Sequence, residues 1–334
     1  MKALVTGATG LVGSAVVREL LRHGQEVKVL VRPTSNRLNL KGLDLEEVSG
    51  DITDYGSILN ALKGCDRVYN VAALYTVSDP TDAYYRINVE GTRNVLRACL
   101  NAGIQRVVYT STVGAVGSAR NGRVADEETS WDLGDLNIPY ATTKYIAEFE
   151  AYRAYTKGLP VVIVCPTGPM GERDVKPTPT GKLIVDFLNG KMPLYPQMHF
   201  NVIDVDDVAL GHRLAMEKGR PGERYILGNK NVSLSEILHT IAHLTGVPGP
   251  MMAIPYPAVL IVSFLAELFI SHILHRPTMF TVGGARFLKR VMHASNEKAV
   301  KELGLTLTPF EEVLKKAIRW FHGHGYIRRP IRVP

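Results

Sequence analysis

A glycine-rich segment close to the N-terminus, Thr6-Gly7-Ala8-Thr9-Gly10-Leu11-Val12-Gly13, follows a short apolar run and leads into an amphipathic stretch of helix length. Simple turn chemistry does not call for three glycines at this regular spacing. At such a junction Gly7 permits a tight turn, Gly10 lets a pyrophosphate approach the backbone, and Gly13 lets the helix pack closely. The helix N-terminus adds free N–H groups and a positive dipole end. We therefore predict a dinucleotide site, with cofactor contacts from Gly7, Thr9, Gly10, Leu11, Val12 and Gly13.

Short runs rich in valine, isoleucine and leucine alternate with helix-length segments through the first half of the chain. The runs are continuously apolar, as in parallel strands that helices cover on both faces. Helices expected at 12–23 and 88–102 each end at a glycine suited to a left-handed cap. This pattern predicts an α/β fold with a doubly wound parallel sheet of the Rossmann kind. Its expected strands are residues 2–6, 26–31, 45–48, 67–71, 106–111 and 160–164.

The character of the chain changes after residue 165. Six prolines between Pro166 and Pro196 indicate long loops over a smaller, irregular region. We expect a dinucleotide-binding Rossmann domain over 1–165 and a mainly substrate-binding region over 166–334. A strand expected at 201–205 and a helix at 208–218 are predicted to rejoin the first domain at about 200–220.

Residues 258–274 form a strongly apolar stretch with one charge, slightly short for a bilayer span. Ser263, Glu267, Ser271 and His275 follow one another at spacings of four, which places them along one side of a helix. This stretch predicts a buried or pocket-covering lid helix. A helix lying on a membrane surface and a true span are the alternatives.

The charge balance and the cysteines limit the compartment and the ligands. A net charge of +7 favours anionic ligands or an anionic surface, although no nucleic-acid partner is predicted. Cys65, Cys99 and Cys165 are odd in number and widely spaced, which predicts reduced thiols in a cytoplasmic protein. The N-terminal apolar run is too short for a signal peptide. His322 and His324 have no acidic or cysteine ligand nearby, so we predict no metal site.

The expected second strand is followed by Arg32, where an NAD-binding site usually carries an acid for the ribose 2′-hydroxyl. Arg32, with Arg37 as a second contact, can pair with a 2′-phosphate through charge-assisted hydrogen bonds. The residues thus favour NADP(H) over NAD(H). The alternative is that Arg32 is a solvated surface residue.

Two further strand ends supply predicted cofactor contacts. Asp51, followed by Ile52, is expected beside the adenine amino group, with a turn or helix cap as the alternative role for Asp51. Ala72 and Ala73 follow the fourth strand, where small side chains let a cofactor lie against the backbone.

Tyr140 and Lys144 form a Y-x-x-x-K pair in a helical stretch, so both side chains project from one face. A neighbouring ammonium favours the phenolate form and brings Tyr140 toward useful acid/base chemistry. The segment Tyr109-Thr110-Ser111-Thr112 ends the fifth strand with hydroxyls that could polarise a substrate carbonyl. Together these residues predict a catalytic site beside the dinucleotide, in which Tyr140 and Lys144 also contact the cofactor and Lys144 holds the nicotinamide ribose.

In order and spacing, these motifs resemble the extended short-chain dehydrogenase/reductase family over essentially the whole chain. The resemblance implies that Thr112, Tyr140 and Lys144 are catalytic and that Asn88 supports a water-mediated proton path to the lysine. Ser111 replaces Thr112 if the register slips by one. It also implies a homodimer built on the helices at 88–102 and 139–155.

Within that family, residues 30–33 and 166–181 are similar to the dihydroflavonol-4-reductase-like subgroup, especially its bacterial members labelled hopanoid-associated sugar epimerases. The first name implies NADPH-dependent ketone reduction, and the second implies turnover of a nucleotide sugar. From this resemblance we expect cofactor contacts from Pro166 and Thr167 and substrate contacts from Tyr75, Tyr84, Thr112 and Met170.

The leading hypothesis is a reductase that transfers hydride from NADPH to a ketone or aldehyde. An apolar lid suits a bulky hydrophobic small molecule, and it also permits loose association with a membrane surface. A nucleotide-sugar epimerase or dehydratase is the first alternative, kept open by Arg173, Lys176 and Lys182. A non-catalytic protein that senses NADP(H) is the second.

Overall fold

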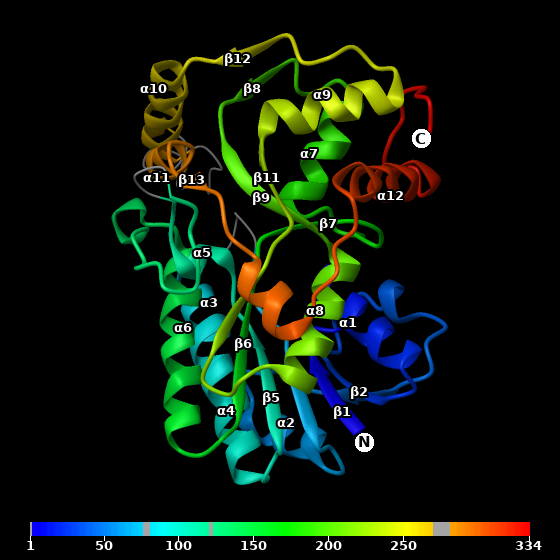
Figure 1. The fold of residues 1–334 in the computed structure, drawn as a ribbon, viewed down its shortest axis with the longest axis vertical. Coiled ribbons are helices and arrows are strands. Elements are labelled where there is room, and N and C mark those ends of the chain that lie inside the picture. The colour runs from blue at the N-terminus through cyan, green and yellow to red at the C-terminus, as the bar shows by residue number, and fades with distance from the viewer. Residues whose placement is uncertain (1, 76–80, 120–122, 270–280) are drawn as a thin grey trace.

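The computed structural model describes residues 2–75, 81–119, 123–269 and 281–334. A seven-stranded sheet lies at the centre of its larger part, in the order β10-β6-β5-β4-β1-β2-β3 (Figure 1). All six neighbouring pairs of this sheet are parallel, which confirms the predicted doubly wound sheet. The strands are β1 (Lys2–Thr6), β2 (Glu26–Val31), β3 (Glu46–Ser49), β4 (Arg67–Asn70), β5 (Arg106–Thr110), β6 (Val161–Pro166) and β10 (Arg224–Leu227).

Helices cover both faces of this sheet (Figure 1). On one face, α1 (Leu11–Arg22) and α8 (Val205–Lys218) pack together and share a core with β1 and β2. On the other face lie α2 (Tyr55–Leu62), α4 (Thr92–Asn101) and α6 (Pro139–Thr156), which share a core with β4, β5 and β6. Burial on both faces explains why the strands are continuously apolar.

A smaller part is built around a second sheet, in which β9 (His199–Asp204) pairs with β7 (Gly168–Met170), β11 (Lys230–Ser233) and β13 (Val291–Met292). The strand expected at 201–205 therefore does not rejoin the first sheet. The edge position beside β6 is taken by β10, 20 residues further along. A third core joins α7 (Pro179–Leu188), α9 (Leu234–Thr245) and α12 (Phe310–Gly323). A short ladder of β8 (Leu194–Pro196) and β12 (Met252–Ile254) lies beside them.

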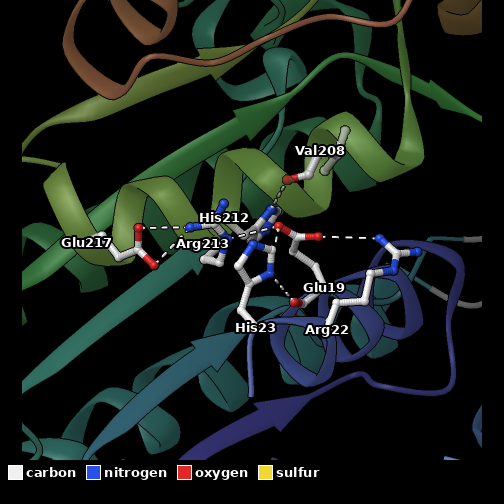
Figure 2. A network of polar contacts seen from close by, with 7 residues as sticks. All are labelled: Glu19, Arg22, His23, Val208, His212, Arg213 and Glu217. Carbon is white, nitrogen blue, oxygen red and sulfur yellow. Dashed lines mark hydrogen bonds and ion pairs between the residues drawn. The ribbon is translucent and has the colours of Figure 1, made fainter. Parts of the chain in front are cut away.

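Helix α8 ties the second half of the chain to the first through ionic contacts with α1 (Figure 2). Arg213 donates from Nε to Oε1 of Glu19 over 2.9 Å, and from Nη1 to Glu217 on its own helix. Glu19 is largely buried, so loss of Arg213 would leave its carboxylate buried without this partner. The part of the molecule built on the first sheet thus contains residues from well beyond 165.

His212 of α8 lies fully buried between the helix and the sheet. Its Nδ1 is 2.7 Å from the Val208 carbonyl oxygen, which can only accept, so Nδ1 carries the proton. Its Nε2 then accepts from the Thr110 hydroxyl over 2.8 Å. Burial lowers the pKa of His212 to about 4 and keeps the ring neutral.

We expect His212 to make the protein less stable as the pH falls from about 6.5, the ordinary histidine pKa, toward 4. Between these two pH values the His212 ring binds a proton in the unfolded chain, whereas it stays neutral in the folded chain. The cost is about 1.4 kcal/mol of unfolding free energy per pH unit, from this group alone. Urea unfolding at several pH values should therefore show a shallower pH slope for His212→Asn than for the wild type. His239→Asn, at an exposed position on α9, is the control. Equal slopes for wild type and His212→Asn would contradict the assignment.

The apolar stretch from 258 begins as helix α10 (Tyr256–Ala266). The expectation of a buried helix is wrong for the part that the structure describes, because its large apolar side chains are exposed and only Ser263 is buried. The polar side faces inward instead, since Glu267 Oε2 accepts from the Val282 N–H at the start of α11 (Val282–Phe287) over 2.7 Å. Ser271 and His275 lie outside the described residues. Among the helices described, none is long and apolar enough to cross a bilayer.

Candidate active site

The glycine-rich turn between β1 and α1 has the close packing that its sequence predicts. Gly7 has a φ of +69°, and a Cβ there would lie 2.7 Å from the backbone of Ala72. A Cβ on Gly13 would overlap the carbonyl oxygen of Gly7. Gly10 is different, because it is exposed and a Cβ there meets nothing closer than 3.4 Å. Because Gly10 has no side chain, a ligand can approach the backbone of the turn there from the solvent side.

This turn fits a dinucleotide pyrophosphate. Gly10 is the N-cap of α1 and provides no side-chain acceptor, so the first N–H groups of the helix have no side-chain cap. No acidic residue stands in the first turn of α1, although an acid there would repel a phosphate. Thr9, Leu11 and Val12 lie around this helix start, and the Thr9 carbonyl accepts from Asn39 Nδ2 over 3.2 Å. Asn39 also donates to the Arg173 carbonyl over 3.1 Å, a link that sequence reasoning missed.

The two arginines after β2 differ in whether other residues already engage their guanidinium groups. Arg32 is exposed, and no hydrogen bond or ion pair of its guanidinium occurs with any residue of the described ranges. Arg37 is engaged, because it donates to Glu47 Oε2 over 2.8 Å and to the Ser35 carbonyl over 3.1 Å. Arg32 is therefore the better candidate for a 2′-phosphate, and Arg37 shapes the loop around it.

The other predicted cofactor residues line neighbouring strand ends. Asp51 Oδ1 accepts from the backbone and hydroxyl of Thr53, which is the turn role left open above. Ile52 is buried, and the Ala72 N–H donates to the Thr6 hydroxyl over 3.2 Å. Thr167 follows the end of β6 and uses its hydroxyl to hold Asn201 at 2.9 Å. The remaining predicted contacts, Ala73 and Pro166, lie directly beside these positions at the ends of β4 and β6.

Tyr140 and Thr112 are brought together at the end of β5. Pro139 begins α6, and Tyr140 is its second residue. Thr112 caps the short helix α5 (Val113–Val116), where its hydroxyl accepts from the Gly114 N–H over 3.2 Å. The Thr112 hydroxyl also lies close to the Tyr140 phenol and lowers its pKa, but burial is the larger effect and raises the pKa overall. The lowering expected from the Lys144 ammonium does not appear in this structure. The phenol is therefore protonated at neutral pH and can act as a proton donor.

Lys144 lies one helical turn further into the protein and is fully buried. Its Nζ donates to the Tyr109 hydroxyl over 2.9 Å and to the Thr110 carbonyl over 2.6 Å. Burial lowers the pKa of Lys144 to about 8. The ammonium thus remains mostly charged at neutral pH, on the same face of α6 as Tyr140.

Ser111 and Thr112 are distinguished by their partners. Ser111 is buried and donates its hydroxyl to the Glu148 carboxylate, whereas Thr112 contacts Tyr140. Glu148 was missed from the sequence, although Tyr140, Lys144 and Glu148 follow at spacings of four on α6. Its second oxygen lies 3.4 Å from Arg224, and burial raises the pKa of its carboxyl.

Asn88 holds the loop that follows β4. It lies in a π-helical segment, Tyr85–Gly91, and its Oδ1 accepts from the Leu74 N–H over 2.7 Å. Its Nδ2 donates to the Leu74 carbonyl over 3.2 Å and to the Thr143 hydroxyl over 3.1 Å. The described contacts of Asn88 hold Leu74 and Thr143 in place. The proton path through Asn88 to Lys144 therefore stays a prediction.

The predicted substrate residues separate into two groups. The rings of Tyr75 and Tyr140 lie 4.5 Å apart, and Tyr75 is 52% exposed, so it faces the approach to the phenol. Tyr84 is buried, and its hydroxyl contributes to the raised pKa of Tyr140. Met170 instead packs into the third core with 1% exposure, where it is structural.

Comparisons with known proteins agree with this geometry. The model of the NAD dependent epimerase/dehydratase family matches residues 3–228. A Synechocystis sp. protein, described provisionally as a dihydroflavonol 4-reductase, is 40% identical over 97% of this chain and 95% of its own length. Sterol demethylase protein B of Methylococcus capsulatus is 33% identical over 98% of this chain and all of its own.

Solved structures show the same arrangement. The crystal structure of gox2253 superposes with a TM-score of 0.89 and 39% identity, covering 98% of this chain and 99% of that one. MoeE5, solved in complex with UDP-glucose and NAD, gives a TM-score of 0.75 and 26% identity over 97% of this chain and 99% of its own. A nicotinamide dinucleotide is thus bound by a relative of this fold.

Proposed function

This chain belongs to the NAD dependent epimerase/dehydratase family, an extended short-chain dehydrogenase/reductase family, and on that premise we propose that it reduces a ketone or aldehyde with NADPH. The observation that carries the proposal is the placement of Tyr140 at the start of α6, close to Thr112 at the end of β5, with Lys144 one turn further along the same helix face. A proton donor is what carbonyl reduction requires at the oxygen, while the hydride goes to the carbon. A bound NADPH supplies that hydride from C4 of its nicotinamide.

In this mechanism Thr112 orients the substrate carbonyl by donating a hydrogen bond to its oxygen, and Tyr140 Oη transfers its proton to the same oxygen. The negative charge left on Tyr140 would be stabilised by the ammonium of Lys144, one turn further along the same face of α6, which Tyr109 and Thr110 hold in place in this structure. Asn88 keeps the loop at Leu74 in place, next to Tyr75 and the phenol.

Arg32 supports NADPH over NADH. No described ion pair or hydrogen bond has to be broken for the exposed Arg32 guanidinium to bind a phosphate, whereas an acid at this position would repel a 2′-phosphate. The pyrophosphate would bind at Gly10 and the start of α1, which the fit of the turn supports.

A bulky hydrophobic substrate is supported by two observations. Two of the cations that would favour a nucleotide sugar are engaged elsewhere, since Arg173 pairs with Glu172 at 3.2 Å and Lys182 pairs with Asp186. The relatives named above include one named for sterol demethylation and one described provisionally as a dihydroflavonol 4-reductase, and sterols and flavonoids are larger and less polar than a sugar.

The decisive experiment is a fluorescence titration of the purified protein with NADPH and NADH, followed by turnover assays with hydrophobic ketones, aldehydes and nucleotide sugars. We expect NADPH to bind more tightly, and Arg32→Ala to weaken NADPH about 10–100-fold, since hydrogen bonds to charged groups contribute about 1.5–3 kcal/mol. NADH binding should change little. Arg67→Ala, at the far end of the sheet where β4 begins, is the control.

Steady NADPH consumption with a ketone would support the reductase. Equal binding of NADH and NADPH, unaffected by Arg32→Ala, would contradict the cofactor proposal. A nucleotide-sugar epimerase is the second candidate, favoured by the similarity to the UDP-glucose complex of MoeE5. It predicts sugar conversion without net loss of the dinucleotide, and exposed Lys176 is the remaining cation for a diphosphate.

A further inference from the structure

Helix α10 and the turn after it expose an unusual number of large apolar side chains. We call this surface the α10 face. It consists of Ile261, Val262, Phe264, Leu265, Leu268 and Phe269, with exposed fractions between 40% and 60%. Contiguous apolar surface of this kind is rare on a protein that has no partner there. We therefore expect an apolar partner or environment to cover the α10 face.

The orientation of α10 is fixed by its polar contacts. Ser263 is buried, and Glu267 accepts from the first N–H group of α11. Lys289 Nζ lies 4.1 Å from the centre of the Tyr256 ring at the other end of α10. Because the polar side is held against α11, the apolar side points away from the protein.

The described charges on α10 and α11 are mostly positive. They are Arg286, Lys289 and Arg290 against Glu267, although Arg290 pairs with Asp135 of the neighbouring turn at 3.1 Å. Arg286 and Lys289 are exposed, and Arg286 has no ion-pair partner among the residues that the structure describes. The one acid is already engaged by α11.

More exposed apolar residues lie at the same end of the molecule (Figure 1). Met251 is 80% exposed and Met252 60% exposed, and Met252 pairs across the β8–β12 ladder with Leu194, which is 43% exposed. The exposed apolar surface at this end of the molecule thus extends beyond α10 to the β8–β12 ladder.

We propose that the α10 face docks on the surface of a bilayer that contains anionic phospholipids. Apolar side chains that enter the headgroup boundary, next to cations that meet lipid phosphates, are the pattern of an interfacial helix. A second copy of this chain fits less well, because a symmetric contact would bring Arg286 and Lys289 close to their own counterparts in a chain of net charge +7.

The α10 face is connected to the candidate active site. Helix α10 packs on α11, and α11 packs on the turn Gly134–Leu136, so closely that a Cβ on Gly283 would overlap the Leu136 carbonyl oxygen. That turn precedes Tyr140 by four residues. Docking would place the approach to Tyr140 near the bilayer, so that a lipid-borne ketone could reach it, an inference that rests on the proposed function.

The test is flotation of the purified full-length protein with vesicles of phosphatidylcholine, alone or mixed with phosphatidylglycerol. We expect binding to the mixed vesicles that weakens with added salt. The variant Phe264→Ser/Leu265→Ser should bind at least about tenfold more weakly, because both apolar side chains are lost from the contact. Arg286→Glu/Lys289→Glu should remove the preference for phosphatidylglycerol. The matched control is Val300→Ser/Val333→Ser, which alters apolar residues of similar exposure elsewhere.

Absence of wild-type binding, or equal binding by the Phe264/Leu265 variant, would overturn the proposal. So would light scattering that showed the same variant to dissociate an oligomer, since a second copy would then cover the face. NADPH oxidation with a water-soluble ketone, measured without vesicles, separates the two proposals. Turnover without vesicle binding rejects only the docking, and vesicle binding without turnover of any ketone rejects only the reductase.

Discussion

Replacement of Tyr140 by phenylalanine is expected to lower kcat for carbonyl reduction by about 10²–10⁴-fold, the usual contribution of a positioned general acid. The ring remains and still packs against Tyr75, so the change removes only the hydroxyl and its contact with Thr112. NADPH affinity should fall much less than kcat, because the turn at Gly10 and the Arg32 side chain, which would hold the phosphates, are untouched. Stopped-flow assays with one ketone substrate would measure kcat, and a parallel titration would measure binding.

Tyr155→Phe provides the matched control, since Tyr155 lies on the same helix, is 43% exposed and is remote from Thr112. It should behave as the wild type. If Tyr140→Phe kept full turnover, the proton would have to come from another group. If the wild type bound NADPH but turned over no substrate, the hypothesis of a non-catalytic sensor would gain support.

Substitution of Gly13 by alanine is the second change with a large expected effect. The added methyl group would overlap the Gly7 carbonyl oxygen, which is backbone and cannot swing aside as a side chain can. Helix α1 would have to move away from the turn, and with it the N–H groups that face the pyrophosphate. We expect NADPH to bind about 100-fold more weakly, or about 2.7 kcal/mol, together with a lower melting temperature.

Gly323→Ala is the control for this substitution. Gly323 ends α12, and a Cβ there meets nothing within 4 Å, so binding and stability should be maintained or slightly improved. Calorimetry and the fluorescence titration would give both quantities. Unchanged NADPH affinity in Gly13→Ala would mean that the dinucleotide does not use this turn.

The parts of the site that could be predicted from sequence are those fixed by local backbone geometry. Gly7 and Gly13 are required by contacts within a few residues of the turn and with the residues that follow β4, the strand paired with β1, so their spacing is informative by itself. Tyr140 and Lys144 share a face of α6 because helical periodicity places them there. The strands β1 and β2 begin and end at the predicted residues. Their limits could be predicted because turn residues mark both ends of each apolar run.

What could not be predicted depends on partners that are distant in the chain. Arg37 was paired with the cofactor in the prediction, but Glu47 of β3 engages it. Met170 is in the motif-bearing loop, yet it enters a core formed with α9 and α12, which come more than 60 residues later. The polar side of α10 faces inward because the Glu267 carboxylate accepts a hydrogen bond from the N–H at the start of α11. Periodicity identifies a polar side of a helix but does not say which side the protein covers.

The position of β10 at the edge of the first sheet has a consequence for folding during synthesis. β6 is buried along its whole length and pairs with β5 on one side, but its other side is closed only by β10, which begins at Arg224. At roughly 5–20 residues per second, a ribosome needs on the order of seconds to pass from one strand to the other. During that time the nascent chain carries an open, apolar strand edge that can pair with another chain. A fragment ending near residue 165 would keep that edge permanently and should aggregate, so we expect that the chain cannot be cut at the predicted border between its two regions.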